Sequence, residues 1–113
     1  MRNLVLGMML LFVTLSAQAQ DKKNKNAKYN IEVNGNCEQC QKRIQKAAFS
    51  VPGVKSADWH IDDHILHLII NEEKCTVLDV KNAIAKVGHD TDEVKSTSEA
   101  YNKLPDCCQF DRK

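Results

Sequence analysis

The sequence predicts one α+β domain in which two helices cover one face of a four-stranded antiparallel sheet. Short segments with alternating apolar residues and longer segments with apolar residues at helical spacing follow in the order strand, helix, strand, strand, helix, strand. This order is that of the split βαβ, or ferredoxin-like, βαββαβ sandwich. The chain has 113 residues, of which 42% are hydrophobic and 27% charged, and this composition is typical of a small globular domain.

Residues 1–19 have the pattern of a secretory signal peptide. Arg2 gives a basic start, Leu4–Leu15 is almost wholly apolar, and two alanines follow at cleavage spacing. The apolar run is shorter than the roughly 18 residues that span a bilayer, so we expect cleavage and no membrane association afterwards. The sequence therefore predicts a periplasmic or secreted protein, in which residues 20–28 form a polar linker.

Charge and cysteine content narrow the class of protein. Arg2 is the only charged residue lost with 1–19, which leaves 15 basic against 15 acidic residues. A neutral chain argues against nucleic acid as a partner. Because the five cysteines are an odd number, at least one lies outside any intrachain disulfide, and a disulfide framework fits poorly.

The first half of the domain, which we place at 29–95, begins with an alternating strand at Tyr29–Val33 and a turn at Asn34–Asn36. A helix opens at Cys37 and ends at Pro52. Its apolar residues recur at steps of three and four and form one buried stripe: Cys40, Ile44, Ala47, Ala48 and Val51.

Residues 54–70 hold two strands around Asp62-Asp63. A two-residue turn there places one set of side chains toward the core (Ala57, Trp59, Leu66 and Leu68) and another on the opposite face (Asp58, His60, Ile65 and His67). Since Asp-Asp lacks glycine, a longer loop with a shifted register is the alternative. We interpret His60 and His67 as cross-strand neighbours, with an imidazole metal site as the alternative.

A second helix follows, with Thr76 as N-cap and Asp79 three residues later. Its apolar positions continue at helical spacing up to Gly88, and a short fourth strand is expected at 92–95. The remaining tail, 96–113, either docks on the domain or hangs free.

The motif Cys37-Glu38-Gln39-Cys40 places two sulfurs at the start of the first helix, where the helix N-terminus stabilises thiolates. Two thiolates at positions i and i+3 give a low-coordinate, all-sulfur site, which suits Cu(I) best and leaves Hg(II) and Zn(II) as alternatives. We expect Cys37 and Cys40 both to be exposed, so that the ion is exchanged easily.

In the order and spacing of these features, 29–95 resembles the heavy-metal-associated domain family, found in copper chaperones, periplasmic mercury-binding proteins and metal-pumping ATPases. The resemblance rests on the cysteine motif, Pro52-Gly53-Val54 and Val87-Gly88-His89-Asp90. The family pattern has Met and Thr where this chain has Gly35 and Asn36. In the family, that methionine usually packs under the metal loop, which is the turn and cysteine motif at the start of the first helix.

The resemblance implies a metallochaperone or scavenger, not an enzyme, that exchanges its ion with a metal-transporting ATPase or another donor or acceptor protein. It would act as a monomer or a metal-bridged dimer. It also implies that His89 lies near the metal loop, as a candidate third ligand. A basic helix edge of Lys42, Arg43 and Lys46 is either a solvated face or a docking surface for an acidic partner.

The tail cysteines Cys107 and Cys108 lie outside the family pattern. If the tail folds back, they are candidate ligands beside Cys37 and Cys40. Otherwise they are exposed thiols or pair with Cys75 or another chain.

A thiol-disulfide oxidoreductase is the enzymatic alternative, because it also carries CxxC at a helix N-terminus. Glu38-Gln39 contains neither proline nor glycine, no Trp precedes the motif, and the chain is short for a thioredoxin-like fold. These features favour metal binding.

Overall fold

The computed structural model describes residues 23–112; the predicted signal peptide lies outside them. In chain order the elements are β1 (Ala27–Glu32), α2 (Glu38–Phe49), β2 (Val54–Trp59), β3 (Ile65–Ile70), α3 (Val77–Lys86), α4 (Ser98–Asn102) and the 3₁₀ helix η1 (Asp106–Cys108). Of the described residues, none belongs to a helix with the length and apolar content to cross a membrane.

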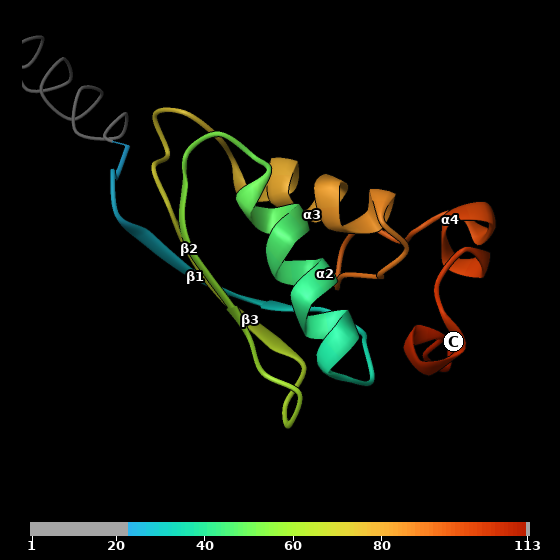
Figure 1. Cartoon of the computed structure of the whole chain (residues 1–113). Helices are drawn as coiled ribbons and strands as arrows, with labels where there is room; N and C mark the ends of the chain where they lie inside the picture. The colour runs from blue at the N-terminus through green and yellow to red at the C-terminus, as the bar shows by residue number, and fades with distance from the viewer. Residues whose placement is uncertain (1–22, 113) are drawn as a thin grey trace, which may run out of the picture.

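The sheet has the strand order β1-β3-β2, with both neighbouring pairs antiparallel. Helices α2 and α3 pack against the same face of this sheet (Figure 1). The side chains between the two layers form the core, and the largest of those fully buried include Trp59, Ile31, Ile44, Leu66 and Ile84. The two-layer α+β architecture predicted from the sequence is confirmed.

The expected fourth strand at 92–95 is wrong: within the described residues the sheet has three strands. Just before this segment, Thr91 forms a single antiparallel β-bridge with Val33. Strand pairing stops there because Thr91 turns the chain: its N–H donates to the carbonyl of Val94, and its hydroxyl oxygen accepts from the N–H of Val94.

The hairpin has the register that a turn at Asp62-Asp63 requires, with Trp59 opposite Leu66 and Asp58 opposite His67. The predicted faces are therefore confirmed. The connection between the two strands extends from His60 to His64. His64 has a left-handed backbone conformation, with φ 61°.

Helix α3 begins as the sequence indicates. The Thr76 hydroxyl accepts from the N–H of Asp79, and the Asp79 carboxylate accepts from the N–H of Thr76. This capping box satisfies two N–H groups that the helix leaves unpaired.

The tail folds back on the domain. Leu104, Cys108 and Phe110 join the buried core cluster. Arg112 clamps the end of the tail with a bidentate ion pair to the buried carboxylate of Asp90, at 3.0 and 3.1 Å, and donates to the carbonyl of Ser96. The docking places η1 beside the N-terminus of α2 (Figure 1).

Candidate metal centre

Trp59 supports the loop that precedes α2, both by a hydrogen bond and by packing against it. The indole N–H of Trp59 donates to the carbonyl of Val33 at 3.0 Å. A Cβ atom built at Gly35 would lie 3.1 Å from the Trp59 ring and 3.1 Å from the Cβ of Cys40. Gly35 therefore lets the indole ring pack directly under the loop, where the family pattern has methionine.

Sequence reasoning missed this role of Trp59. The available signal was the coincidence of a glycine at the methionine position with a single large aromatic residue on the core face of the hairpin.

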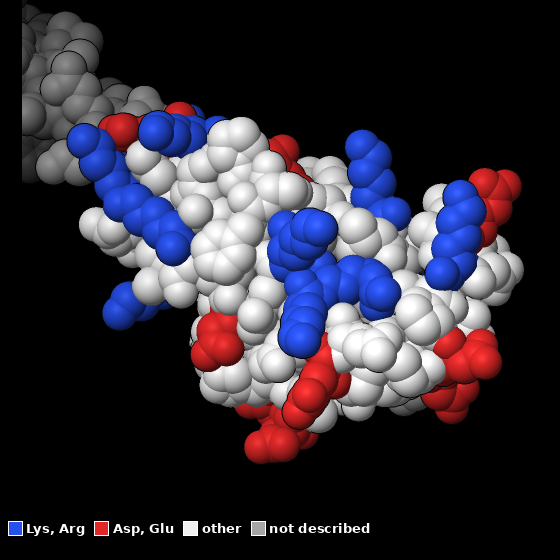
Figure 2. Space-filling model, viewed as in Figure 1, with Lys and Arg blue, Asp and Glu red and all other residues white. Residues whose placement is uncertain are grey.

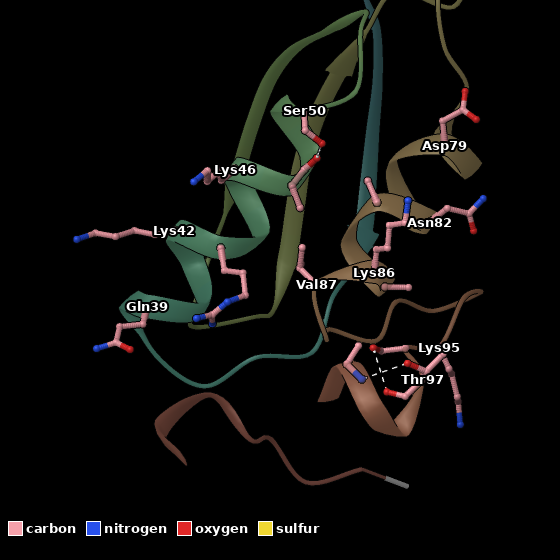
Figure 3. A pocket seen from close by; sticks show the side chains of 16 residues that line it. Gln39, Lys42, Lys46, Ser50, Asp79, Asn82, Lys86, Val87, Lys95 and Thr97 are labelled. Atoms are coloured by element: carbon pink, nitrogen blue, oxygen red, sulfur yellow. Dashed lines mark hydrogen bonds between the residues drawn. The ribbon is translucent and has the colours of Figure 1, made fainter. Parts of the chain in front are cut away.

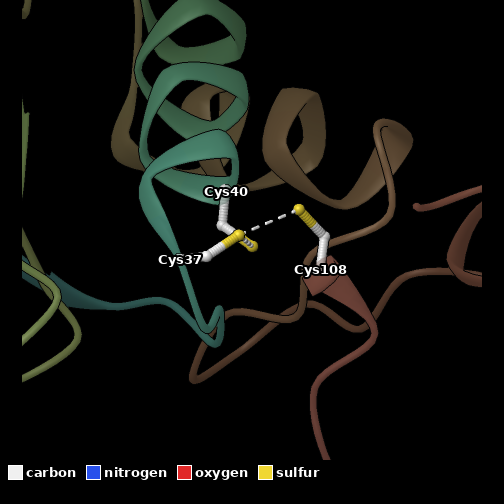
Figure 4. A group of neighbouring side chains, drawn as sticks. All are labelled: Cys37, Cys40 and Cys108. Atoms are coloured by element: carbon white, nitrogen blue, oxygen red, sulfur yellow. Dashed lines mark hydrogen bonds between the residues drawn. The ribbon is translucent and has the colours of Figure 1, made fainter. Parts of the chain in front are cut away.

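Three sulfur atoms converge at the start of α2. The Sγ atom of Cys37 lies 3.4 Å from that of Cys40 and 3.5 Å from that of Cys108 in η1, and all three lie within 4.8 Å of one another. Figure 4 shows Cys108 approaching the pair from the opposite side. All five cysteines are free thiols. The chain thus brings together a group able to hold a metal ion with three sulfurs.

Access to the three sulfurs is unequal. Cys37 is partly exposed, whereas Cys40 and Cys108 are each 0% exposed. The expectation that both cysteines of the motif are exposed is therefore wrong for Cys40. The reason is that Cys40 heads the buried stripe of α2 and lies against the Gly35 loop.

The thiols differ in acidity. Burial raises the pKa of Cys40 to about 12 and raises that of Cys108. Burial acts in the same direction on Cys37, but the N–H of Cys40 and the thiols of Cys108 and Cys40 outweigh it and lower the pKa of Cys37 to about 7. In the metal-free protein, Cys37 is therefore the thiol of the cluster that ionises most readily.

Arg43 adds a positive charge to the cluster. Its Nη1 donates to the sulfur of Cys108 at 3.2 Å. A guanidinium in this position favours the thiolate form that binds metal. The sequence placed Arg43 on an exposed basic edge, and only the docked tail shows that it reaches a sulfur.

Cys107 and His89 lie outside this three-sulfur group. Cys107 is exposed, with its sulfur 3.8 Å from that of Cys108 and donating to the Oε1 of Gln39. His89 is fully buried; its Nδ1 bonds the carbonyl of Asn34 at 2.8 Å, and its ring stacks on Phe110. Burial lowers the pKa of His89, so the imidazole is neutral and supports the loop before the cysteines.

A groove of about 1160 Å³ lies between α2, α3 and α4. Its basic lining residues are Lys42, Arg43, Lys46, Lys86 and Lys95, and the acidic one is Asp79. Figure 3 shows Lys42 and Lys46 along α2. Figure 2 shows Lys and Arg side chains gathered over the middle of this face, where Figure 1 places α2. The groove therefore presents positive charge beside the sulfur cluster.

Comparison with known proteins finds similarity in sequence over about half of the chain. The chain is 33% identical over 61 residues to a protein named copper chaperone CopZ from two strains of Staphylococcus epidermidis, covering 53% of this chain and 90% of that protein. No protein-family profile matches the chain.

Solved structures with a similar fold cover about the same share of the chain. A CopZ metallochaperone has 26% identity and a TM-score of 0.56, with 57% of this chain and 98% of that chain covered. The N-terminal domain of a potential copper-translocating P-type ATPase from Bacillus subtilis, in its Cu(I)-loaded state, has 25% identity and a TM-score of 0.56, covering 58% and 84%. Oxidized MerP from Ralstonia metallidurans CH34, at 20% identity, shares the fold, with a TM-score of 0.51 and coverage of 57% and 94%.

Proposed function

Because this chain belongs to the heavy-metal-associated domain family of copper chaperones, we propose that it carries one Cu(I) ion and passes it to another protein. The named relatives and the sulfur cluster support metal binding and a chaperone-type role. The observation that carries the proposal for Cu(I) is the convergence of three sulfurs with no oxygen or nitrogen ligand among them. An all-sulfur site of low coordination number suits Cu(I) better than Zn(II), which normally takes four ligands.

We assign the ion to Cys37, Cys40 and Cys108. An ion about 2.3 Å from each of three sulfurs in one plane sets the sulfurs about 4 Å apart. The observed separations from Cys37, 3.4 and 3.5 Å, reach this value with small side-chain movements. Cys107 lies beside the site as an exposed thiol, and we give it no permanent bond to the ion.

Transfer proceeds by ligand exchange at the accessible side of the cluster. An incoming thiolate of the partner forms a bond to the ion, and the bond to Cys37 breaks. Cys37 is the ligand that leaves first because it alone of the three is partly exposed. Cys40 and Cys108 hold the ion inside the protein until the partner has supplied its own sulfur.

The partner we propose is a metal-transporting ATPase or another donor or acceptor protein with a similar domain. Likeness to a domain of a potential copper-translocating ATPase supports this partner class. The basic groove supports an acidic docking surface on the partner, since opposite charges steer association. Export to the periplasm or outside the cell is part of the proposal and rests on the pattern of residues 1–19.

The test is anaerobic titration of the reduced protein with Cu(I) against a competing chelator. We expect one equivalent of Cu(I) for the wild type and none for Cys37→Ser or Cys40→Ser, with the circular dichroism spectrum unchanged. Cys75→Ser is the matched control, because Cys75 is also buried but lies outside the sulfur cluster. Stoichiometric binding by both motif variants would contradict the proposal.

The alternatives have their own measurements. Competition between Cu(I), Hg(II) and Zn(II) for the reduced protein ranks the ions. Reduction of insulin at rates typical of thioredoxin would favour the oxidoreductase instead.

A further inference from the structure

A second group of metal-binding side chains lies at the β2–β3 hairpin, remote in sequence from the three cysteines. His60 follows β2, Asp63 lies in the connection, and His67 is within β3. One ring nitrogen of each histidine and a carboxylate oxygen of Asp63 all lie within 4.8 Å of one another. The two imidazole rings have centroids 4.5 Å apart, and all three side chains are exposed to solvent.

The backbone of the hairpin fixes this grouping. The N–H of His60 donates to the carbonyl of Ile65, and the N–H of His64 donates to the carbonyl of His60, which closes the connection. The carboxylate of Asp63 accepts from the N–H of Ile65 at 2.9 Å. These bonds fix the backbone positions of His60 and Asp63 relative to the start of β3.

His64, the remaining histidine of the hairpin, is separate from the group. It is partly buried, and its ring stacks on Trp59 with the centroids 5.7 Å apart and the planes 7° from parallel. The hairpin therefore supplies its own control residue, a histidine close in sequence but outside the cluster.

Asp58 supports the group from the neighbouring position. It lies opposite His67 in the sheet, and its carboxylate is 2.9 Å from the Nε2 of His60. A histidine that binds metal through one ring nitrogen usually donates a hydrogen bond from the other to a carboxylate or carbonyl. The pairing of Asp58 with His60 supplies that outer partner.

We propose that His60, Asp63 and His67 form a second metal site, which binds a divalent ion of the Zn(II) or Cu(II) class. Two imidazoles and a carboxylate are the ligands that these ions prefer, whereas Cu(I) prefers the sulfurs. Metal–nitrogen bonds of about 2.0–2.1 Å require the ligand atoms to close to about 3.4 Å, and exposed side chains reach this by rotation. The chain would then hold two metal sites of different chemistry.

The test uses untagged full-length protein, first saturated with one equivalent of Cu(I) under anaerobic conditions, and then titrated calorimetrically with Zn(II). We expect one further equivalent to bind with micromolar affinity. His60→Ala and His67→Ala should each abolish that binding, while His64→Asn, which tolerates the left-handed backbone, should retain it. A variant with Ser in place of Cys37, Cys40, Cys107 and Cys108 repeats the titration with Zn(II) and Cu(II) without the sulfur cluster.

Outer-partner and spectroscopic measurements complete the test. Asp58→Asn should weaken Zn(II) binding about tenfold, and Asp62→Asn, on the same hairpin, should leave it unchanged. Zn(II) should shift the imidazole NMR signals of His60 and His67 but not that of His89. Absence of saturable binding, or binding unaffected by loss of His60 and His67, would overturn the proposal. Cu(I) binding by these histidine variants should equal that of the wild type, so failure here is distinguishable from failure of the sulfur site.

Discussion

The sulfur of Cys108 lies 3.5 Å from that of Cys37 although 71 positions separate the two residues. The match to CopZ extends over 61 residues and is therefore too short to contain both cysteines. The third sulfur comes from a tail added to the family domain. Its contribution turns a pair of sulfurs at a helix end into a cluster of three, of which two are fully buried.

Cys108→Ser should lower the number of sulfurs bound to Cu(I) from three to two, as measured by X-ray absorption spectroscopy. The affinity for Cu(I) should fall by about tenfold, or about 1.4 kcal/mol, because Cys37 and Cys40, three positions apart at the start of one helix, still hold the ion as a pair. In either motif variant the remaining pair would instead depend on Cys108 of the docked tail, so those variants lose the ion. Trimming the chain after Ser98 should have the same effect. Three sulfurs around Cu(I) in the trimmed chain would show that Cys108 is not a ligand.

Arg112→Ala should release the tail. The change leaves the buried carboxylate of Asp90 without its charged partner and removes the guanidinium from its position 4.8 Å above the Tyr101 ring. We expect a loss of about 2 kcal/mol in the free energy of tail docking, seen as faster hydrogen exchange at 103–110. Cu(I) should also pass faster to a chelator. Lys103→Ala, an exposed cation on the same tail, is the control and should change neither rate.

Gly35→Ala should destabilise the protein by about 1–3 kcal/mol because the new Cβ would press on the Trp59 ring and on Cys40. Trp59→Phe frees space at the same point, so the double variant should be less destabilised than the sum of the single variants by about 1 kcal/mol. Urea unfolding of the four proteins in this cycle measures the coupling. Additive effects would mean that Gly35 and Trp59 act independently.

Acidification should weaken the fold through His89. Burial lowers its pKa in the folded state below the ordinary value of 6.5, so the unfolded chain takes up the proton more readily. The free energy of unfolding should therefore fall as the pH decreases through 6.5 toward the folded-state pKa. His89→Gln should flatten this slope in urea titrations between pH 5 and about 7. An unchanged slope in His89→Gln would refute this origin.

The features that the sequence alone determined are those set by neighbours along the chain. Helix spacing placed Cys37 and Cys40 at the first turn of α2, and the Thr76 capping box marked the start of α3. Alternation of apolar residues in the hairpin determined its register, because a slip of one residue would expose Trp59 and Leu66.

Tertiary structure alone decided what happens between distant segments. Docking of the tail depends on the burial of Leu104 and Phe110 and on the ion pair between Arg112 and Asp90. These contacts could not be predicted from the sequence, because the tail is short and its apolar residues have no helical or strand period. The same docking brings Cys108 to the motif cysteines. The residues after Thr91 could either pair with β1 as a fourth strand or form a local turn. In the folded chain the turn forms, and the pairing is limited to one bridge.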